Sequence, residues 1–371
     1  MVVKGVTIQD LHFGHKRSAE MYEELKLITD YLEKNDVHVL NINGDYFDRK
    51  LVGTEPAIFY AVNFFSDLVK ICKRKGIKVR IIQGTRSHEL NQLTTMFQHY
   101  LSDSELDMKI FLEATEEELL GMRVLYVPEE YPENGEEHYK RFLSKDYNVM
   151  HGHGTWDFVS FIANDSYEEN SKLGMHSAPV FKYDDWKHCI RNGLAIFGHI
   201  HKRQSFKNVY YSGSFTAWGY GDRSKKGFTA YEIDTKTNKW KFTYIDNEKA
   251  PKYDVLSVKD IVDVTKATTE EIQRLLSEQV GETDNLRIDL SGLSKDKVEL
   301  LKKFFNGNGK VKVEVREKKE MLKESAEPAI YEKYGYILKR ELPLDETVKR
   351  FIKEEYNSEM TLEKIKELLT E

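Results

Sequence analysis

The sequence predicts an α/β protein with a parallel first half and a largely antiparallel second half. Up to about residue 105, apolar β-type runs alternate with helical segments, an arrangement that links parallel neighbouring strands. Beyond that point the β-type runs follow one another more closely, which favours a second sheet packed face to face with the first. The chain of 371 residues is too long for one small core, so two domains and an appendage are expected.

Strands and helices alternate through the first hundred residues. Strand patterns lie in "VKGVTIQDLH" (3–12), "VHVLNINGDYFD" (37–48) and "IKVRIIQG" (77–84). The helices between them cover residues 19–36 and 57–76, and Gly76 closes the second helix. The later strand patterns lie at 122–129, 147–154, 193–201, 209–215, 227–234 and 240–246.

The composition changes after residue 250, where the first domain (1–250) is expected to end. Residues 251–318 alternate strand and helix patterns and predict a small α/β module. Residues 319–344 are charged, carry two prolines and predict a tether. The tail, residues 345–371, has apolar side chains at helical spacing, so C-terminal helices are expected there.

Bulk properties exclude several classes of protein. The net charge of −6 rules out a general basic field for nucleic acid, so any such contact must be local, metal-assisted or shared with a partner. Cys72 and Cys189 form no C-x-x-C pair, which suits a reducing cytosol. The N-terminus lacks the apolar core of a signal peptide, and no run of about 20 apolar residues predicts a membrane span.

Metal-ligand residue types recur where the predicted strands end. They are Asp10 and His12, Asp45 and Asp48, His88 and Glu89, His151 and His153, and His199 and His201. Ligand sites in α/β sheets gather outside the carboxyl ends of the strands, so these five segments are expected to converge. Each pair alone has an ordinary explanation, such as Asp10 capping the next helix. The complete ordered series indicates a cation site.

The series "DLHFGH", "NGDYFD", "GTRSHE", "MHGHG" and "FGHIH" resembles the calcineurin-like metallophosphoesterases. The resemblance implies their fold, a four-layer α-β-β-α sandwich. The stretch "YYSGSFTAWGYGDRSKKGFTAYEID" is similar to the SbcD-type DNA repair exonucleases, and the small α/β module takes the place of their capping, DNA-binding domain. The resemblance covers roughly residues 1–316 and is weaker in the module.

The resemblance implies a binuclear site, most often holding Mn²⁺, and assigns its ligands. One ion would take Asp10, His12, Asp45 and His201, and the other would take Asp45, His151, His199 and one further ligand. His88 would contact the scissile phosphate or protonate the leaving 3′-oxygen, with Glu89 orienting its ring, and Asp48 would belong to the catalytic residues. His15 is at best an outer neighbour, and His153 is expected to be a neighbour of His151.

The segment "GTRSHE" departs from the family pattern, in which an Asn before the His supplies the further ligand. Ser87 stands in that place, so three readings are open. Ser87 binds the metal directly, a water held by Ser87 or Thr85 replaces it, or the second ion binds loosely. Arg86 could bind substrate phosphate or be an ordinary solvated arginine. Lys202 and Arg203 are candidate contacts to the DNA backbone.

The activity implied is a metal-dependent DNA exonuclease or endonuclease acting in repair, recombination or replication. The family resemblance also implies a homodimer, an SbcC-type coiled-coil ABC ATPase as partner, and a cytoplasmic location in a bacterial cell or, for a phage protein, in its host. The tail would dock the ATPase or, alternatively, fold back as a helical cap. Two rival functions are a stand-alone phosphatase of the same fold and a weakly active scaffold that binds DNA or the ATPase.

Overall fold

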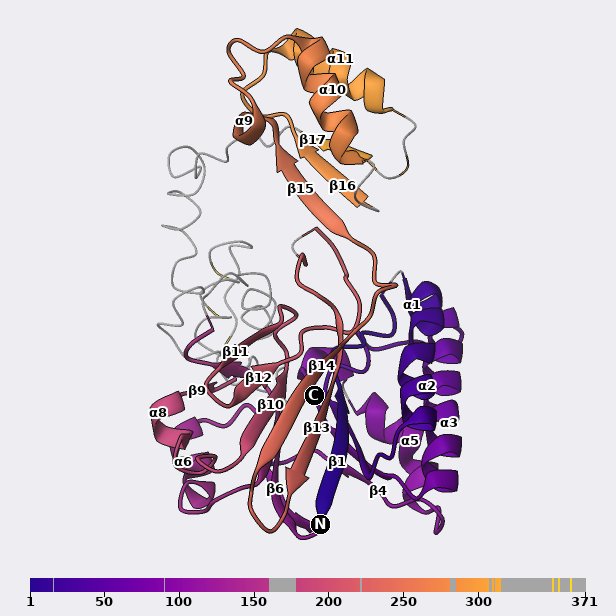
Figure 1. Cartoon of the computed structure of the whole chain (residues 1–371), viewed down its shortest axis with the longest axis vertical. Coiled ribbons are helices and arrows are strands. Elements are labelled where there is room, and N and C mark those ends of the chain that lie inside the picture. The colour runs from indigo at the N-terminus through magenta and orange to yellow at the C-terminus, as the bar shows by residue number, and fades with distance from the viewer. Residues whose placement is uncertain are drawn as a thin grey trace. The chain divides into compact units, whose positions relative to one another are not determined.

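The computed structural model describes residues 1–15, 17–89, 91–159, 178–220, 222–280, 285–306 and 311–314, with the single residues 309, 349, 353 and 361. The predicted tether and almost all of the predicted tail lie outside these residues. The predicted α/β class is confirmed, because the described part of the first 250 residues contains two six-stranded sheets, a two-stranded sheet of β8 (Thr155–Trp156) and β9 (Val180–Phe181), and a set of helices (Figure 1).

The first sheet has the strand order β14-β13-β1-β2-β3-β4. Its strands are β1 (Val2–Ile8), β2 (Val39–Asn43), β3 (Lys78–Ile82), β4 (Met108–Phe111), β13 (Gly227–Asp234) and β14 (Trp240–Asp246). Strands β1 to β4 are parallel, as the alternating pattern predicted, and β13 and β14 join antiparallel at the edge. Every residue of β2 is buried, which is typical of a parallel strand covered on both faces.

The second sheet has the order β11-β12-β10-β7-β6-β5. Its strands are β5 (Thr115–Leu119), β6 (Met122–Val127), β7 (Val149–His153), β10 (Leu194–Gly198), β11 (Gln204–Phe206) and β12 (Val209–Tyr211). The expectation of a largely antiparallel second half is wrong for the four central strands of this sheet, β6, β7, β10 and β12, which run parallel to one another. It holds for the edge strands β5 and β11 and for β13 and β14, which pair antiparallel. The chain between β6 and β7 passes through a short helix and a 3-10 turn, which returns it to the same end of the sheet.

Helices cover the outer faces of both sheets (Figure 1). On the first sheet these are α1 (Ser18–Glu24), α2 (Lys26–Lys34), α3 (Pro56–Lys75) and α5 (Gln92–Leu101); on the second they are α6 (Gly135–Tyr139), the 3-10 helix η1 (Lys140–Phe142) and α8 (Tyr183–Trp186). The helix predicted over residues 19–36 is divided into α1 and α2 at Leu25. Helix α3 ends at Gly76 as predicted, because Gly76 adopts a left-handed conformation with φ of 68°.

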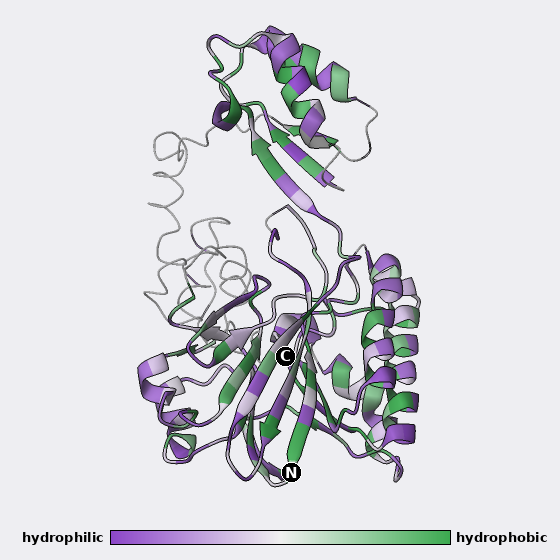
Figure 2. Ribbon diagram, in the orientation of Figure 1, coloured by the Kyte–Doolittle hydropathy of each residue, from purple (hydrophilic) through white to green (hydrophobic). Residues whose placement is uncertain are grey.

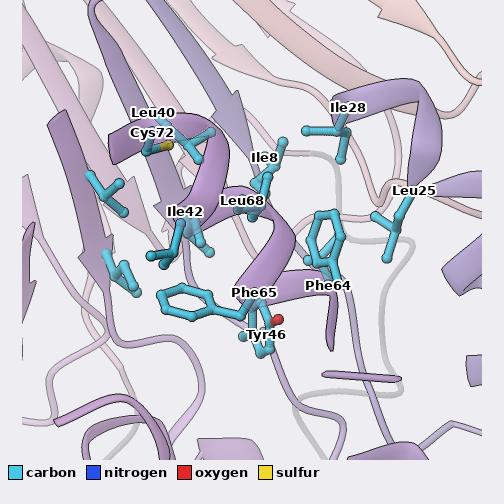
Figure 3. Close-up of a cluster of buried hydrophobic side chains, with 14 of the residues drawn as sticks. Ile8, Leu25, Ile28, Leu40, Ile42, Tyr46, Phe64, Phe65, Leu68 and Cys72 are labelled. Carbon is cyan, nitrogen blue, oxygen red and sulfur yellow. The ribbon is translucent and has the colours of Figure 1, made fainter. Parts of the chain in front are cut away.

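Three clusters of buried hydrophobic residues lie between these layers. Figure 3 shows the core between the first sheet and its helices, where Ile8 and Ile42 of the strands meet Phe65 and Leu68 of α3. A second core lies between the other sheet and its helices. The third joins the sheets, with Val39 and Ile82 from one and Val124 and Ile196 from the other. Figure 2 shows the green hydrophobic residues along the strands and alternating with polar residues on α1, α2 and α3. The layers are therefore α-β-β-α, as expected.

The described residues after 250 contain the elements expected of a small α/β module. Strands β15 (Tyr253–Ser257), β16 (Asn285–Asp289) and β17 (Val311–Glu314) form one sheet, and the helices are α9 (Val258–Ile261), α10 (Thr269–Val280) and α11 (Lys295–Phe305). The chain divides into two compact units, and Met1–Leu256, which holds both large sheets, belongs to one of them. The predicted domain boundary at 250/251 stays a prediction. Among the described helices, none is both long and apolar enough to cross a membrane.

Candidate metal centre

The loops that follow the parallel strands of both sheets meet at one place. Hydrogen bonds tie the first loop to the second, with the Asp10 amide 3.1 Å from the Gly44 carbonyl oxygen and the His12 amide 2.9 Å from that of Asp45. The Glu129 amide, after β6, donates to the Gln83 carbonyl at 3.1 Å and so ties the second sheet to the end of β3. The convergence predicted from the strand ends is therefore present.

The backbone of these loops is unusual. Eight non-glycine residues in the described parts of the chain have a positive φ, and four of them belong to these loops: Asp10, His12, Asp45 and His199, at 51°, 48°, 48° and 88°. Side chains other than glycine rarely adopt this region, and such backbone concentrates where function requires it. The loops therefore hold these four side chains at a cost in local backbone energy.

Asp10, His12 and His201 form the first group of ligand atoms. The Nε2 atoms of His12 and His201 are 2.9 Å apart, and each offers a lone pair when its ring is protonated at the other nitrogen. Oδ1 of Asp10 accepts the His199 amide at 2.9 Å, whereas the buried Oδ2 has no hydrogen-bond partner among the described residues. The two imidazoles and the unpartnered oxygen are a set of ligands that suits a divalent cation.

Asp45 lies at the centre of the site, and its two carboxylate oxygens make different contacts. Oδ1 accepts the Thr85 amide at 2.7 Å. Oδ2 faces three imidazoles, at 3.0 Å from His88 Nδ1, 3.4 Å from His153 Nε2 and 3.7 Å from His12 Nε2. Burial would raise the pKa of Asp45, but His153 and His88 outweigh it and hold the pKa well below its usual range. Asp45 is thus a carboxylate shared by neighbouring groups of ligands.

Asp45, His153 and His199 form a second group, and Asp45 with His12 and His88 forms a third. Glu129 adjoins the second group: its Oε2 is 3.3 Å from His199 Nδ1 and 3.5 Å from His153 Nε2. This oxygen also accepts the Thr85 hydroxyl at 3.2 Å. The second group therefore has both imidazole and carboxylate atoms around one point.

The structure places His153, not His151, in the cluster. Nδ1 of His153 donates to the Asn43 carbonyl at 2.8 Å, so the buried Nε2 is the ring nitrogen that faces Asp45. Nδ1 of His151 instead lies 3.3 Å from Nδ2 of the Asn43 side chain, and its Nε2 lies 3.3 Å from the Tyr231 hydroxyl. Burial lowers the pKa of His151 to about 3, so it is a neutral core residue. The expectation that His151 is a ligand is corrected accordingly.

Glycines allow the loops to approach one another this closely. A Cβ atom on Gly84 would lie 2.2 Å from the Asp45 amide nitrogen and 2.4 Å from its Oδ1. A Cβ atom on Gly198 would lie 2.3 Å from the Asn43 carbonyl oxygen and 2.7 Å from His153 Nδ1. All four distances are far below van der Waals contact, so only glycine leaves room for Asp45 and His153 where they stand.

His88 lies at the open side of the cluster, with 22% of its side chain exposed. Burial would lower its pKa, but the charge and the hydrogen bond of Asp45 raise it to about 9. The ring is therefore readily protonated, and its Nδ1 is hydrogen-bonded to Asp45. Asp48 Oδ1 lies 3.2 Å from His12 Nδ1, which makes Asp48 a neighbour that positions His12.

Glu89 does not orient His88, contrary to the expectation from the family. Its two oxygens accept the Tyr46 amide at 2.8 Å and the Gly84 amide at 2.7 Å. Burial, followed by the repulsion of Asp45, raises the pKa of Glu89 to about 7. Glu89 fastens the loop after β2 to the loop after β3, and this is a structural role.

Thr85 and not Ser87 supplies the hydroxyl at the cluster. The Thr85 Oγ1 lies 3.3 Å from Asp45 Oδ2, whereas Ser87, half-buried in the short helix α4 (Arg86–Glu89), makes no hydrogen bond to the cluster within the described residues. Direct ligation by Ser87 is therefore not supported by this geometry.

The three basic residues predicted to bind substrate differ in their surroundings. Arg86 and Lys202 are exposed, and they lie close in sequence to His88 and His201 of the site. Arg203 is engaged elsewhere: it donates to Asp246 Oδ1 at 2.6 Å, and its guanidinium carbon lies 4.4 Å from the centroid of the Tyr244 ring. Arg203 therefore has a structural role, and the expectation that it contacts DNA is corrected.

Glu129 and Thr85 adjoin the cluster, but neither was predicted as a ligand. A signal for Glu129 exists in the sequence, because "MRVLYVPE" is a strand pattern that ends in a metal-ligand residue type, like the five segments that were singled out. A glutamate after a proline at a strand end is otherwise ordinary, so this signal is weak by itself.

Comparison with known proteins adds little to this geometry. No protein-family model and no curated protein matches the chain. Among solved structures, TT1561 of Thermus thermophilus is similar at 12% identity over 66% of this chain and 99% of its own, with a TM-score of 0.38. YfcE, a phosphoesterase from E. coli, is similar at 11% identity over 66% of this chain and 100% of its own, with a TM-score of 0.31. TM-scores this low do not support an inference about function.

Proposed function

We propose that this chain is a metal-dependent phosphodiesterase of the calcineurin-like metallophosphoesterase type, with DNA as its substrate. The observation that carries the proposal is the position of Asp45, whose Oδ2 faces the imidazoles of two adjoining ligand groups. A carboxylate shared in this way is suited to bridge two cations, the arrangement used by many phosphoester hydrolases.

Asp10, His12, Asp45 and His201 would hold one ion, and Asp45, His153 and His199 would hold the other. Mixed imidazole and carboxylate ligands suit Mn²⁺, although Zn²⁺ and Fe²⁺ also fit such a set. When bound, two divalent ions supply a hydroxide near neutral pH and stabilise the charge on the phosphate oxygens. The buried Asp10 Oδ2, which has no hydrogen-bond partner among the described residues, supports this assignment, because buried polar atoms ordinarily have partners.

His88 is the proposed catalytic residue. Hydrolysis forms a bond from a water oxygen to phosphorus and breaks the bond to the leaving 3′-oxygen, which then takes up a proton. His88, held through Nδ1 by Asp45, can direct Nε2 to that oxygen and, when protonated, can give it a proton and pair with the phosphate charge. Its partial exposure gives a substrate access to the ring.

DNA is favoured over a small phosphoester for two reasons. Arg86 and Lys202 are exposed near His88 and His201 in the sequence, where they could contact phosphates next to the scissile one. The chain also carries a small α/β module, which resembles the capping module of DNA nucleases and which a phosphatase does not need. The net charge of −6 opposes DNA binding by this chain alone, so a partner is expected to supply part of the contact with DNA.

An SbcC-type ATPase and a second copy of this chain remain the proposed partners. Large apolar side chains are exposed on and before α3, namely Val52, Phe59 and Val62, with exposed fractions of 65%, 64% and 37%. Exposed apolar side chains of this kind support a contact between two copies of the chain, because their exposure to water is costly.

The scaffold alternative depended on a weak second metal site at Ser87. Asp45, His153 and His199 supply three ligands without Ser87, which argues against that alternative. A stand-alone phosphatase would use the same metal chemistry, so only its substrate would distinguish it from the proposed nuclease.

The test compares hydrolysis of linear duplex DNA, single-stranded DNA, bis(p-nitrophenyl) phosphate and p-nitrophenyl phosphate in Mn²⁺. The proposal predicts cleavage of DNA and the diester with little action on the monoester. It also predicts that His88→Ala abolishes cleavage while two ions remain bound per chain. Preferential hydrolysis of the monoester would favour the phosphatase, and loss of the ions from His88→Ala would make His88 a ligand instead.

A further inference from the structure

We propose that Glu129 is the remaining ligand of the second ion, a carboxylate in a position for which the sequence suggested a serine or a water. This inference rests on the proposed function and adds one residue to its metal site. Asp45, His153 and His199 supply three ligand atoms, and Oε2 of Glu129 adjoins them, within 3.5 Å of a ring nitrogen of each histidine.

The carboxylate of Glu129 is held in a fixed orientation. Its oxygen Oε1 accepts the Tyr131 hydroxyl, and its backbone amide donates to Gln83. Oε2 accepts the Thr85 hydroxyl at 3.2 Å and keeps a lone pair for a cation. Since a carboxylate oxygen offers about two lone pairs, Thr85 and an ion can share Oε2.

The charge of the pocket also favours a bound cation. Glu129 and Asp45 are both buried and both lie within hydrogen-bond distance of the same Thr85 hydroxyl, so two carboxylates stand close together away from water. Burying like charges is costly unless a positive charge lies between them. His153 and His199 provide that charge only if protonated, whereas as ligands they are neutral and a divalent ion provides it instead.

A purely structural alternative makes Glu129 the ion-pair partner of His199 and nothing more. The two roles differ in one measurable respect. A ligand sets the affinity of the second ion, whereas an ion-pair partner changes stability and leaves metal binding intact.

The experiment titrates the metal-free full-length chain with Mn²⁺ by calorimetry and counts bound ions by elemental analysis. The variant is Glu129→Gln, which keeps the shape of the side chain and removes its charge. The matched control is Glu130→Gln, because Glu130 lies next along the chain and pairs with His138 at 3.1 Å, away from the cluster. The expected result is two ions for the wild type and the control, and at least about tenfold weaker binding of one ion in Glu129→Gln.

Each outcome separates this inference from the proposed function. If the wild-type chain binds no divalent ion, the proposed metal site fails with everything built on it. If the wild type and Glu129→Gln both bind two ions with equal affinity, only the role of Glu129 is overturned.

A second measurement covers the case in which Glu129→Gln does not fold. Wild-type crystals soaked in Zn²⁺ and measured by anomalous diffraction should show an ion about 2.0–2.2 Å from Glu129 Oε2. An ion bound by Asp45, His153 and His199 but beyond contact with Glu129 would overturn the inference.

Discussion

Nδ1 of His153 lies 2.8 Å from the carbonyl oxygen of Asn43, and this hydrogen bond joins the last residue of β7 to the last residue of β2 across the two sheets. It fixes a proton on Nδ1 and directs Nε2 toward Asp45, where that nitrogen can bind a cation once it carries no proton. The backbone of one sheet thereby sets the tautomer of a histidine from the other.

The first prediction contrasts the two histidines of β7. His153→Ala should reduce bound Mn²⁺ from two ions to one per chain, because it removes a ligand of the second group. His151→Ala should keep both ions and lower the free energy of unfolding by about 2 kcal/mol, because it leaves a cavity between the sheets. Elemental analysis and thermal melting of the two variants test this, and loss of an ion from His151→Ala alone would reverse the assignment.

The second prediction concerns the close approach at Gly84. Gly84→Ala should weaken Mn²⁺ binding and lower stability by about 1–3 kcal/mol, because the new Cβ would collide with the backbone and side chain of Asp45. Gly53→Ala is the control, since a Cβ there would meet no atom within 4 Å. Equal metal affinity and equal melting temperature in both variants would mean that the loop after β3 does not press on Asp45.

The third prediction concerns stability in acid, away from the metal site. Arg80 is buried and donates to both oxygens of Glu117, at 2.7 Å and 2.9 Å. Burial would raise the pKa of Glu117, but Arg80 and Lys109 outweigh it and lower the pKa. The folded pKa is below the unfolded one, so the ion pair stabilises the fold above about pH 4.5 and this contribution is lost as pH falls through the lowered folded value.

Glu117→Gln should therefore cost about 3 kcal/mol at pH 7, near the lower end of the range for a broken buried ion pair. It should also flatten the loss of stability below about pH 4.5. Glu118→Gln, at an exposed position of the same strand and 3.3 Å from Arg123, should change stability by less than about 0.5 kcal/mol. Urea unfolding across the acidic range up to neutral pH tests both variants, and an unchanged pH profile for Glu117→Gln would contradict the prediction.

Much of the site could be predicted because the rule that places it is general. Asp10, Asp45, His88, His199 and His201 each follow an apolar run, and the carboxyl ends of parallel strands share one edge. The rule applies to strand ends and not to single side chains. It therefore brought the correct segments together without deciding which atom of each segment faces the cluster.

The expectation that His151, and not His153, is a ligand shows the limit of this rule. The two residues are two positions apart in β7, so both point to the same face of the sheet. Their separation along the strand is about 6–7 Å, and only the residue at the carboxyl end reaches the loops. The ligand expected from the family resemblance, His151, lies inside β7, whereas His153 is its last residue.

The parallel order of the second sheet depends on contacts that the sequence does not display. The chain between β6 and β7 contains only five residues of α-helix and a 3-10 turn, too little to produce a clear helical period. Short crossovers of this kind resemble long loops between antiparallel strands. Glu129, two residues after β6, was not grouped with the other strand ends because a glutamate after a proline at a strand end is ordinary.

If Asp45 binds two cations at once, the number of Mn²⁺ ions bound by Asp45→Asn should reveal it. Asp67→Asn serves as control, because Asp67 lies on α3 and pairs with exposed Lys70. We expect two ions per chain for the wild type and the control, and strongly weakened binding of both ions in Asp45→Asn. Two ions bound by Asp45→Asn with unchanged affinity would contradict the shared carboxylate and the hydrolytic function argued from it.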